Sequence, residues 1–476
     1  MPMNFVDRTA ELERLDGLVA AGRSGLVAMW GRRRIGKTRL LLEWCRKNAG
    51  LYSVADLSAG PVQRRYFAQA LSSRFKGFAE VEYPDWRAIL RALAREAGRT
   101  GWRGPLVLDE FPNWVESSPS LPSVLQAFLD HEGREAGLLV VISGSSQHMM
   151  QGLTLHPNAA LFGRALAAVP LGPMSPKAMG EALGIKEAPS CVRAFSVWGG
   201  VPRYWELAEP FGDDLDSAVE RLVLDPMGPL HLEPDRLLVE ERPPAMAVRP
   251  LLDVIGGGAH RVSEIAGRLG VPATSMARGL SRLVELGLVV REQPFGEPGR
   301  SGKRSLYRIT DPFFRMWFRV VAPHRGMLAS GNRHSRLAVW RKLRGTLWSE
   351  TWEQLCRQAV PGLGEGKAPL GGAAGWVPAC RFWRGAGPEW DVVSRSLDGS
   401  SILLGEVKWR EGPVSNEALR RIAHELAAKG SPPVEGLTKA ERVVRAVFVP
   451  EITPGGLLRV GDVRVVTAED VVHSLG

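Results

Sequence analysis

Short apolar runs alternate with helical patterns over the first 175 residues of the chain. Between the runs, hydrophobic positions recur every three or four residues, the period of an amphipathic helix. The expected strands are residues 25–30, 51–57, 106–108 and 138–143, and the expected helices are residues 37–47, 62–75, 86–96 and 121–131. Strands that read as continuous apolar runs are covered on both faces, so the pattern predicts a parallel sheet between layers of helices.

The pattern changes after this region. Residues 176–245 are expected to be mostly helical, with a break at Gly199 and Gly200. Beyond them, a short helix over 262–269, a turn, a longer helix over 273–286 and two strand-like runs have the layout of a winged helix. The chain is therefore expected to divide at residues 1–175, 176–245, 246–312, 313–345 and 346–476, where the fourth segment is an arginine-rich linker and the last returns to α/β patterning.

Composition excludes several classes of protein. Of the 476 residues, 45% are hydrophobic and 24% charged, so disorder is not the main state. Apolar runs stay below the roughly 18 residues that a membrane span needs, and the first residues lack the pattern of a signal peptide. The four cysteines form no CxxC pair, which argues against a zinc ribbon or a disulfide framework. We expect a cytoplasmic protein with no membrane partner.

A complete GxxxxGK[ST] motif lies between an expected strand and an expected helix. Its residues are Gly31, Arg32, Arg33, Arg34, Ile35, Gly36, Lys37 and Thr38, and Arg39 follows. The glycines let the backbone curl so that its N–H groups and the helix N-terminus face a phosphate. Lys37 is expected to reach the β- and γ-phosphates and the Thr38 hydroxyl to ligate Mg²⁺, while the loop arginines point away. Residues 31–39 are the expected binding residues for ATP.

A phosphate loop needs a second, acidic strand, and the segment ending in Asp109 and Glu110 supplies it. Asp109 is expected to hold the Mg²⁺ shell, and Glu110 to polarise the attacking water. Ser143 and Ser145 follow the next expected strand, where a γ-phosphate sensor would lie. The alternative for the two serines is an ordinary serine-rich turn.

These motifs stand in a context that resembles a known family. The segment Phe5-Val6-Asp7-Arg8 precedes WGRRRIGKT, and LVLDEF, VISGSS, Leu161-Phe162-Gly163-Arg164 and Gly199-Gly200-Val201-Pro202 follow. Over about residues 4–205 the chain resembles the archaeal-type ATPase family within the STAND class of signal-transduction P-loop NTPases. The resemblance implies that Phe5 and Arg8 lie near the adenine, that Arg164 is a catalytic γ-phosphate or interface sensor, and that the chain self-associates with ATP. A structural arginine at a sheet edge is the alternative for Arg164.

Positive charge is concentrated between residues 251 and 345. This segment holds 17 Lys and Arg against 6 Asp and Glu, whereas the whole chain has a net charge of +10. Such a local excess favours a polyanion partner, and double-stranded DNA is the expected nucleic acid. An arginine-rich genome is the alternative explanation, since only 11 of the 61 basic residues are lysine.

The winged helix carries part of this charge. Arg278 and Arg282 are four residues apart, so both are expected on one face of the second helix. The Gly/Pro-rich loop carries Arg300, Lys303 and Arg304, as a wing lying along phosphates would. The alternative is a winged helix that only packs against the ATPase, as the STAND resemblance also allows.

Residues 346–476 resemble a restriction-endonuclease-like α/β domain. Asp391, on one expected strand, and Glu406 with Lys408, on the next, form a D…ExK pattern across a turn. Side chains two apart in a strand share a face, so Glu406 and Lys408 are expected together. Asp391 and Glu406 are the expected Mg²⁺ ligands, and with Lys408 the expected catalytic residues of a nuclease. The resemblance adds Glu353 as an extra acidic helix residue; a surface ion pair is the alternative.

The combined prediction is an α/β protein with a P-loop NTPase parallel sheet, a helical lid, a winged helix-turn-helix and a C-terminal restriction-endonuclease-like domain. The expected function is that of an ATP-binding and ATP-hydrolysing P-loop ATPase that couples nucleotide state to nucleic-acid binding. Metal-dependent nuclease activity is left open. The alternatives are a non-catalytic, ATP-switched transcriptional regulator and a signalling scaffold whose nuclease-like domain is inert.

Overall fold

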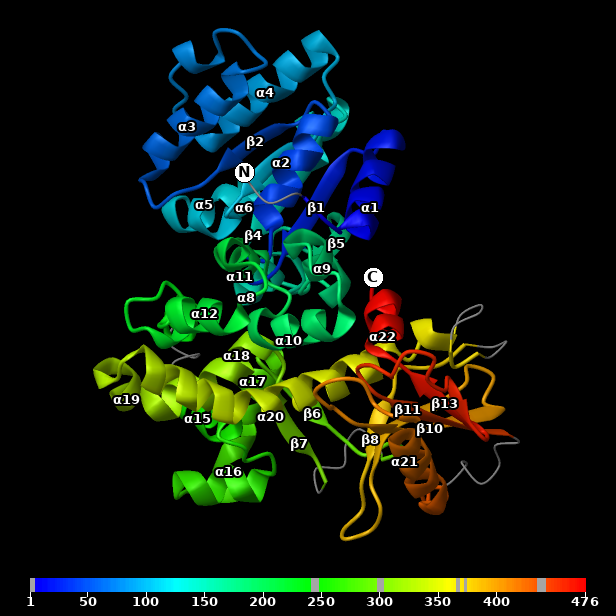
Figure 1. The fold of residues 1–476 in the computed structure, drawn as a ribbon. Helices are drawn as coiled ribbons and strands as arrows, with labels where there is room; N and C mark the ends of the chain where they lie inside the picture. Colours follow the sequence, from blue (N-terminus) through cyan, green and yellow to red (C-terminus); the bar gives the residue numbers. More distant parts are fainter. Residues whose placement is uncertain (1–4, 241–247, 298–303, 365–368, 372–374, 435–441) are drawn as a thin grey trace. The chain divides into compact units, whose positions relative to one another are not determined.

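The computed structural model describes residues 5–240, 248–297, 304–364, 369–371, 375–434 and 442–476. Its backbone contacts divide the chain into two units (Figure 1). The first unit comprises Asp7–Pro173 with Val201–Arg203, and the second comprises Met1–Val6, Met174–Gly200 and Tyr204–Gly476. Each unit contains a sheet of its own.

A five-stranded parallel sheet, in the order β2-β3-β4-β1-β5, forms the centre of the first unit. Its strands are β1 Gly25–Trp30, β2 Leu51–Val54, β3 Leu106–Asp109, β4 Leu139–Gly144 and β5 Ala165–Pro170. Its helices are α1 Thr9–Ala20, α2 Lys37–Lys47, α3 Gly60–Ser72, α4 Trp86–Thr100, α5 Phe111–Ser117, α6 Leu121–Asp130, α7 Glu132–Glu135 and α8 Gln147–Thr154, with a 3-10 turn at Phe78–Glu80. The parallel sheet predicted from the apolar runs is confirmed.

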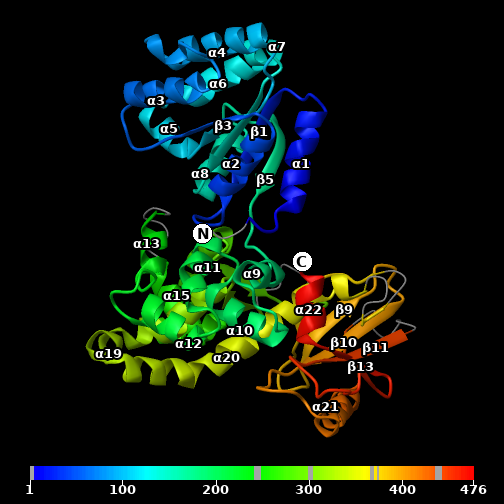
Figure 2. The same cartoon turned by 45° about the horizontal axis from the view of Figure 1, so that its top comes forward.

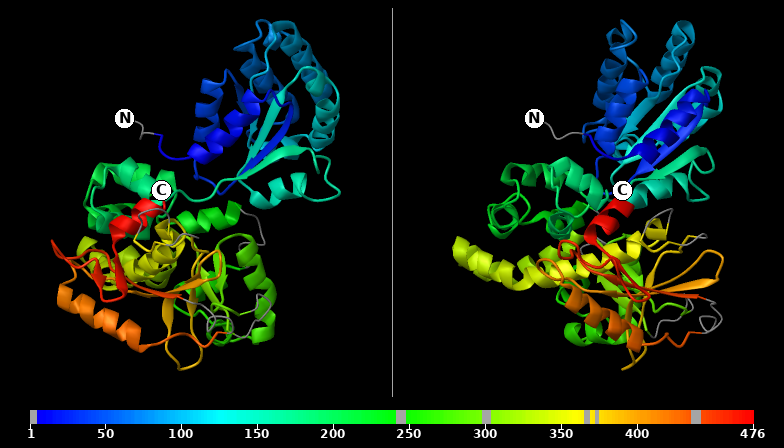
Figure 3. Two further views of the ribbon diagram at one scale, coloured as in Figure 1. Left: turned by 90° about the vertical axis from the view of Figure 1, so that its right-hand side faces the viewer. Right: turned by 45° about the vertical axis from the view of Figure 1, so that its right-hand side comes forward.

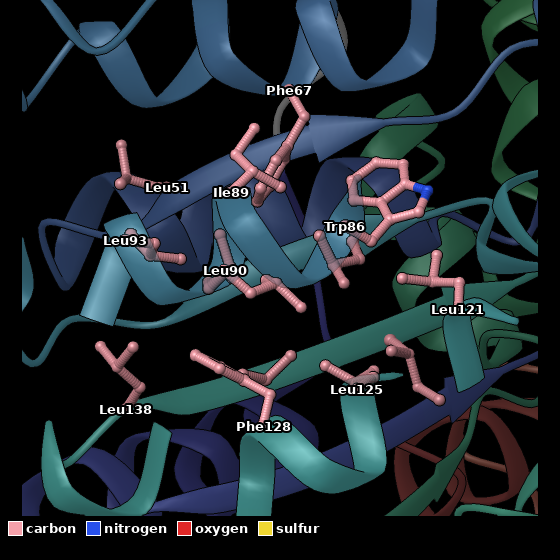
Figure 4. Close-up of a cluster of buried hydrophobic side chains, with 14 of the residues drawn as sticks. Leu51, Phe67, Trp86, Ile89, Leu90, Leu93, Leu121, Leu125, Phe128 and Leu138 are labelled. Carbon is pink, nitrogen blue, oxygen red and sulfur yellow. The ribbon is translucent and has the colours of Figure 1, made fainter. Parts of the chain in front are cut away.

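Helices pack on both faces of this sheet. Leu26, Ala28 and Trp30 of β1 join one buried cluster with α3, α4 and α6, whereas Val27 and Met29 are buried outside that cluster. Successive side chains of a strand point to opposite faces, so these two sets lie on opposite sides of the sheet. Figure 4 shows side chains of α4 and α6 meeting within the cluster. Figure 2 shows α1 beside β5.

The boundaries predicted for this unit agree with the structure to within a few residues, and one strand was not predicted. The helix expected over 37–47 is α2, and the strand expected over 51–57 ends at Val54. There the Asp56 carboxylate accepts a hydrogen bond from the Ser58 N–H, which turns the chain. The missing strand is β5, which is rich in alanine and ends in proline, both weak signals for a strand.

The second unit begins with a helical region and a winged helix. Its first helices are α9 Pro176–Leu183, α10 Ala188–Trp198, α11 Pro202–Ala208, which starts in the first unit, α12 Leu215–Val219, a π-helical turn Glu220–Leu224 and α13 Glu233–Glu240. The winged helix consists of α15 Arg249–Gly256, α16 Val262–Leu269, a 3-10 turn Ala273–Ser275, α17 Met276–Glu285, and the antiparallel strands β6 Val289–Glu292 and β7 Leu306–Ile309. The expected second helix therefore starts three residues late, after the 3-10 turn.

Residues 313–345, predicted as a basic linker, are instead helical and packed. They form α18 Pro312–Met316, a π-helical turn Trp317–Val321, a 3-10 turn Ala322–His324, α19 Arg325–Ser330 and the start of α20 Arg333–Ala359. Phe313, Phe314, Trp317 and Phe318 are buried, and so is Arg315, so this segment is part of a packed core. Helix α20 also runs across the domain boundary predicted after residue 345.

The C-terminal part of the second unit is a six-stranded mixed sheet in the order β12-β13-β11-β10-β9-β8. Its strands are β8 Cys380–Phe382, β9 Trp390–Arg395, β10 Ser401–Val407, β11 Arg442–Phe448, β12 Arg459–Val460 and β13 Val463–Val466, and its helices are α21 Asn416–Ala428 and α22 Ala468–Ser474. Helix α21 packs on β10 and β11 (Figure 3). The predicted α/β fold class is confirmed. No helix in the described part of the chain has the length and apolar character needed to cross a membrane.

Candidate functional site

The phosphate loop connects β1 to α2. A Cβ atom at Gly31 would lie 2.6 Å from the Leu171 carbonyl oxygen, so glycine is needed where the loop passes the end of β5. Arg34 and Gly36 have positive φ angles of 67° and 94°. Residues of alternating handedness turn successive N–H groups inward, which forms an anion-binding concavity. Helix α2 then begins without a side-chain cap, so its N-terminus is open to a phosphate.

The Lys37 ammonium lies within the loop. Its Nζ donates to the carbonyl oxygens of Gly31 at 2.7 Å and Arg32 at 3.3 Å, and the side chain is buried. A phosphate oxygen is a stronger, charge-assisted acceptor than these neutral carbonyls. Arg33 and Arg34 are exposed and Arg32 is half-buried, and the expectation that the loop arginines point away from the phosphate stays a prediction.

Thr38 and Asp109 form the metal side of the site. The Thr38 hydroxyl donates to Asp109 Oδ2 at 2.8 Å, and Asp109 is fully buried at the end of β3. The Tyr52 hydroxyl donates to the same Oδ2 at 2.7 Å, and the Glu110 N–H donates to Oδ1 at 2.9 Å. Burial and the charge of Asp109 raise the pKa of Tyr52 above its usual value. A hydroxyl beside a carboxylate is an oxygen set that suits Mg²⁺, so this donor set fits the expected ion.

Glu110 has a left-handed backbone conformation, with φ 49° and ψ 47°, at the start of α5. Such a conformation costs roughly 1–2 kcal/mol in a residue other than glycine, and it is typical of functional positions. The Glu110 carboxylate accepts the Ser145 hydroxyl on Oε1, and the Ser145 N–H on Oε2 at 3.4 Å. Ser145 is therefore a partner of Glu110. Ser143 Oγ is buried and has no hydrogen-bond partner among the described residues, so its sensor role stays a prediction.

The Arg8 guanidinium is bound by the protein itself. It donates to the carbonyl oxygens of Ile35 at 3.1 Å and Gly172 at 2.8 Å, and it pairs with Glu11 at 3.0 Å. Arg8 therefore holds the start of the chain against the back of the phosphate loop. Phe5 belongs to the second unit, and the adenine contacts expected for Phe5 and Arg8 stay predictions.

Arg164 lies at the edge of the sheet opposite the phosphate loop. The next residue, Ala165, pairs with Leu26 near the start of β1, whereas the loop follows Trp30 at the end of β1. Leu26 and Trp30 are four residues apart along β1, which corresponds to about 13 Å between the start of β5 and the phosphate loop. The guanidinium binds Asp130 at 3.0 Å. The prediction that Arg164 senses the γ-phosphate of its own chain is wrong, because parallel strands place their amino ends at the far edge. A role at an interface stays a prediction.

Strand pairing brings the predicted carboxylates of the C-terminal domain together. Asp391 and Glu406 lie on the antiparallel strands β9 and β10, and Asp391 Oδ2 accepts the Val407 N–H at 2.9 Å. Burial raises the pKa of Asp391 to about 6, and the negative charges of Glu353 and Glu406 contribute in the same direction. Glu353, on α20, thus acts on the same site, as the resemblance implied.

Two ammonium groups neutralise Glu406. Lys408 Nζ lies 2.7 Å from Oε1, and Lys429 Nζ lies 2.5 Å from Oε2 and donates to the Glu389 carbonyl at 2.8 Å. Burial lowers the pKa of Lys408, but the hydrogen bond to Glu406 and the negative charges of Glu406, Asp391 and Glu425 together outweigh it and leave that pKa above the usual value. Glu406 and Lys408 share a face, as strand alternation predicts. Lys429 has no counterpart in the sequence prediction.

These contacts decide how the C-terminal site could take a metal. Within the described ranges, no group of three or more His, Cys, Asp or Glu side chains is arranged to hold a metal ion. Arg357 lies 3.3 Å from the Asp391 carbonyl and 3.7 Å from the Glu353 carboxylate. A divalent ion at Asp391 and Glu406 would have to displace a lysine. The catalytic and metal roles of Asp391, Glu406 and Lys408 therefore stay predictions.

The second helix of the winged helix, α17, presents one unpaired arginine. Arg278 is exposed and has no ion pair or hydrogen bond within the part of the chain that the structure describes. Arg282, one turn later, pairs with Glu285 at 3.2 Å. Of the two arginines predicted for this face, Arg282 is neutralised by Glu285, and Arg278 is the one whose guanidinium has no ion pair among the described residues.

The expected wing is partly engaged in the protein. Arg300 and Lys303 lie outside the described residues, and Arg304 pairs with Glu297. The Phe295 N–H donates to the Arg381 carbonyl on β8 at 2.8 Å, which joins the start of this loop to the edge of the C-terminal sheet.

The arginines of α19 and α20 are largely neutralised by acidic residues elsewhere in the second unit. Asp216 binds both Arg341, at 2.9 Å, and Arg344, at 2.8 Å. Arg336 binds the buried Glu220 at 3.2 Å. Because these carboxylates lie outside residues 251–345, the charge excess counted along the sequence overstates the positive charge of the folded surface.

Sequence patterns gave no indication of two polar contacts. Tyr52 is the second residue of an ordinary strand, and only its place beside the acidic strand could have suggested a role. Lys429 follows α21, 23 residues after its partner Glu406. The scarcity of lysine in the chain is the one signal that could have drawn attention to it.

Comparisons with other proteins cover both units. Residues 5–207 match the ATPase domain found predominantly in Archaea. Residues 317–422 match a family described as archaeal and bacterial proteins of unknown function, whose domain is restriction-endonuclease-like. An uncharacterized protein of Methanocaldococcus jannaschii is 25% identical over 429 residues, which cover 89% of this chain and 91% of that protein.

Two solved structures were compared with the chain, and the first of them is similar in fold. A Walker-type ATPase of Pyrococcus abyssi is 18% identical with a TM-score of 0.53, covering 66% of this chain and 96% of its own. A signal transduction ATPase with numerous domains and a tetratricopeptide repeat sensor, from Pyrococcus horikoshii, is 14% identical with a TM-score of 0.33, covering 75% and 50%. The resemblance to an archaeal-type ATPase family with a C-terminal restriction-endonuclease-like domain is confirmed, and the STAND class stays a prediction.

Proposed function

On the premise that residues 5–207 form an ATP-binding P-loop ATPase domain of the family found predominantly in Archaea, we propose that the chain hydrolyses Mg²⁺-bound ATP and couples its nucleotide state to nucleic-acid binding. One observation carries the first part. The Thr38 hydroxyl meets the buried Asp109 carboxylate at 2.8 Å beside a loop that already encloses the Lys37 ammonium.

Each residue of this site has a separate task in the proposal. Lys37 binds the β- and γ-phosphate oxygens, and Thr38 with Asp109 holds Mg²⁺, which neutralises phosphate charge when bound. Glu110 accepts a proton from the attacking water, and Ser145 orients the Glu110 carboxylate. The backbone N–H groups of the loop orient the phosphates.

Lys37→Ala tests the nucleotide site in the full chain. Loss of the ammonium is expected to weaken ATP binding by at least tenfold and to remove turnover, because a charge-assisted phosphate contact is lost. Binding is measured by fluorescence with a labelled ATP, and turnover by phosphate release. Lys47→Ala, exposed at the far end of α2, is the matched control. ATP binding without turnover in the wild type would favour the ATP-switched regulator instead.

Coupling to nucleic acid rests on α17. Arg278 is exposed and unpaired within the described residues, whereas Arg341 and Arg344 are bound to Asp216. A polyanion contacts a free arginine without first breaking an ion pair. We therefore assign the nucleic-acid surface to the winged helix rather than to α20, with double-stranded DNA as the partner.

Salt dependence tests this surface. Each phosphate contact contributes about −0.9 to the slope of log K against log salt concentration. Arg278→Ala removes one contact and is expected to make the slope less negative by about 0.9. Arg341→Ala, whose arginine is bound to Asp216, is the matched control and should leave the slope unchanged. Affinities are compared with ATP and with ADP. An absence of DNA binding in the wild type would favour the signalling scaffold.

Cleavage of nucleic acid is the third part of the proposal. The pairing of β9 with β10, which carry Asp391 and Glu406, and Lys408 at 2.7 Å from Glu406 support a metal-dependent phosphodiester reaction once Lys429 releases Glu406. Asp391→Ala should then abolish Mg²⁺-dependent cleavage and spare ATP hydrolysis. No cleavage by the wild type with any nucleotide would leave an inert, binding domain.

ATP-dependent self-association completes the proposal. Arg164 lies with Arg23 and Arg134 around a cavity of about 430 Å³ at the amino edge of the parallel sheet. A second copy could present its nucleotide there, which would place Arg164 next to a γ-phosphate. Light scattering with ATP and with ADP tests this, and Arg164→Ala should reduce only the ATP-dependent assembly.

A further inference from the structure

Tyr52 contacts the nucleotide site from a strand that carries none of its motifs. In the parallel pairing of β2 with β3, Tyr52 lies opposite Val107, two residues before Asp109. Residues opposite one another, and residues two apart in a strand, point to the same face. The Tyr52 ring therefore extends along the face on which Asp109 ends β3, and its hydroxyl reaches Asp109 Oδ2 at 2.7 Å.

The Asp109 carboxylate accepts three hydrogen bonds. Oδ2 accepts from the hydroxyls of Tyr52 and Thr38, at 2.7 and 2.8 Å, and Oδ1 accepts from the Glu110 N–H at 2.9 Å. Thr38 lies on the phosphate loop, and Glu110 has a strained backbone at the start of α5. Tyr52 is thus the donor that comes from a regular strand, independent of the loop and of the water-activating residue.

We propose that Tyr52 is a positioning residue for Mg²⁺ at the nucleotide site, an inference that rests on the proposed ATPase function. Its hydroxyl fixes the rotation of the Asp109 carboxylate relative to the Thr38 hydroxyl, which donates to the same oxygen. Groups that orient a metal-binding carboxylate by hydrogen bonding affect metal affinity by roughly 10–100-fold. Tyr52 acts through Asp109 and touches neither the phosphates nor the water.

A purely structural role for Tyr52 is a distinct alternative. Tyr52 is half-buried and lies outside the hydrophobic cluster drawn in Figure 4, so its ring adds little to that core. Replacement by phenylalanine keeps the ring and removes only the hydroxyl. The Tyr52→Phe variant therefore separates the hydrogen bond to Asp109 from the packing of the ring.

The experiment uses the full chain and a fluorescent ATP analogue titrated with Mg²⁺. Tyr52→Phe is expected to lower the apparent Mg²⁺ affinity about tenfold, while nucleotide affinity in EDTA stays at the wild-type value. Saturating Mg²⁺ should restore the turnover of the variant, because the ligands themselves remain. Tyr66→Phe, an exposed tyrosine on α3, is the matched control and should match the wild type throughout.

Three outcomes would overturn the inference. The Mg²⁺ dependence of Tyr52→Phe could equal that of the wild type. Nucleotide affinity in EDTA could fall as much as affinity with Mg²⁺, which would reveal a general distortion. Excess Mg²⁺ could fail to restore turnover. A wild type that binds no nucleotide at any Mg²⁺ concentration would instead overturn the proposed function itself, before any variant is compared.

Discussion

Two sites in this chain combine lysine with a buried carboxylate, and they use the lysine in opposite ways. At the phosphate loop, Lys37 binds neutral backbone carbonyls, and the carboxylate of Asp109 is held by hydroxyl and N–H donors. In the C-terminal domain, Lys408 and Lys429 bind the two oxygens of Glu406 directly.

This difference decides which site is ready for a ligand. A phosphate can replace two neutral carbonyls at Lys37 and gain a charge-assisted bond. At Glu406, a metal must replace an ammonium group that already compensates a buried charge, and removing one partner of such a pair is costly. Similar residue types thus make an open anion site in one domain and a neutralised network in the other.

Glu110→Gln gives the largest expected effect and tests the open site. The amide cannot accept the proton of the attacking water, so turnover should fall at least about 100-fold while ATP binding is retained. Phosphate release and nucleotide affinity are measured together, with Glu96→Gln as control, because Glu96 is half-buried on α4 and paired with Arg99. Unchanged turnover would show that Glu110 does not activate the water. The difference between the phosphate-loop site and the C-terminal site would then not extend to catalysis.

Asp391→Asn tests the neutralised site through pH. Its carboxyl pKa is raised to about 6 from an ordinary value of 3.8, so the folded state binds the proton more tightly than the unfolded state. The contribution of Asp391 to stability, about 3 kcal/mol, should be lost as pH rises from about 4 to 6, and the difference in stability between the wild type and Asp391→Asn should change by that amount.

Urea denaturation in EDTA at pH 4 and pH 7.5 measures this difference. The variant should exceed the wild type at pH 7.5 and equal it at pH 4. Asp398→Asn is the control, because hydrogen bonds from Ser396 and Ser400 lower the pKa of that exposed carboxyl. A difference between wild type and Asp391→Asn that is the same at both pH values would show that burial and the neighbouring carboxylates do not raise the pKa of Asp391.

Lys429→Met should give the smallest effect and decides whether the C-terminal site can be opened. With Lys429 gone, Glu406 Oε2 is released, and Mn²⁺ affinity should rise about fivefold, which corresponds to a partly exposed ion pair of roughly 1 kcal/mol. Mn²⁺ binding is followed by electron paramagnetic resonance in a Lys37→Ala background, with Lys342→Met as control. Unaltered Mn²⁺ binding would mean that the network is structural.

Local features of this protein were predictable from the sequence. The phosphate loop, the helix α2 and the acidic strand β3 depend on residues within about ten positions of one another, so spacing and periodicity predict them well. The same holds for the shared face of Glu406 and Lys408, which follows from strand alternation. The confirmed family resemblance rests on these short motifs.

Contacts between distant segments were decided only by the tertiary structure. The parallel pairing of β5 with β1 places Arg164 at the edge opposite its own phosphate loop, and no pattern along the chain contains that pairing. Asp216 neutralises Arg341 across 125 residues of sequence, and Tyr52 reaches Asp109 across 57. Hydrophobic periodicity predicts which face of a helix or strand is buried but not which other element packs on that face. Ion pairs and hydrogen bonds between distant residues depend on that packing, so the sequence pattern does not predict them.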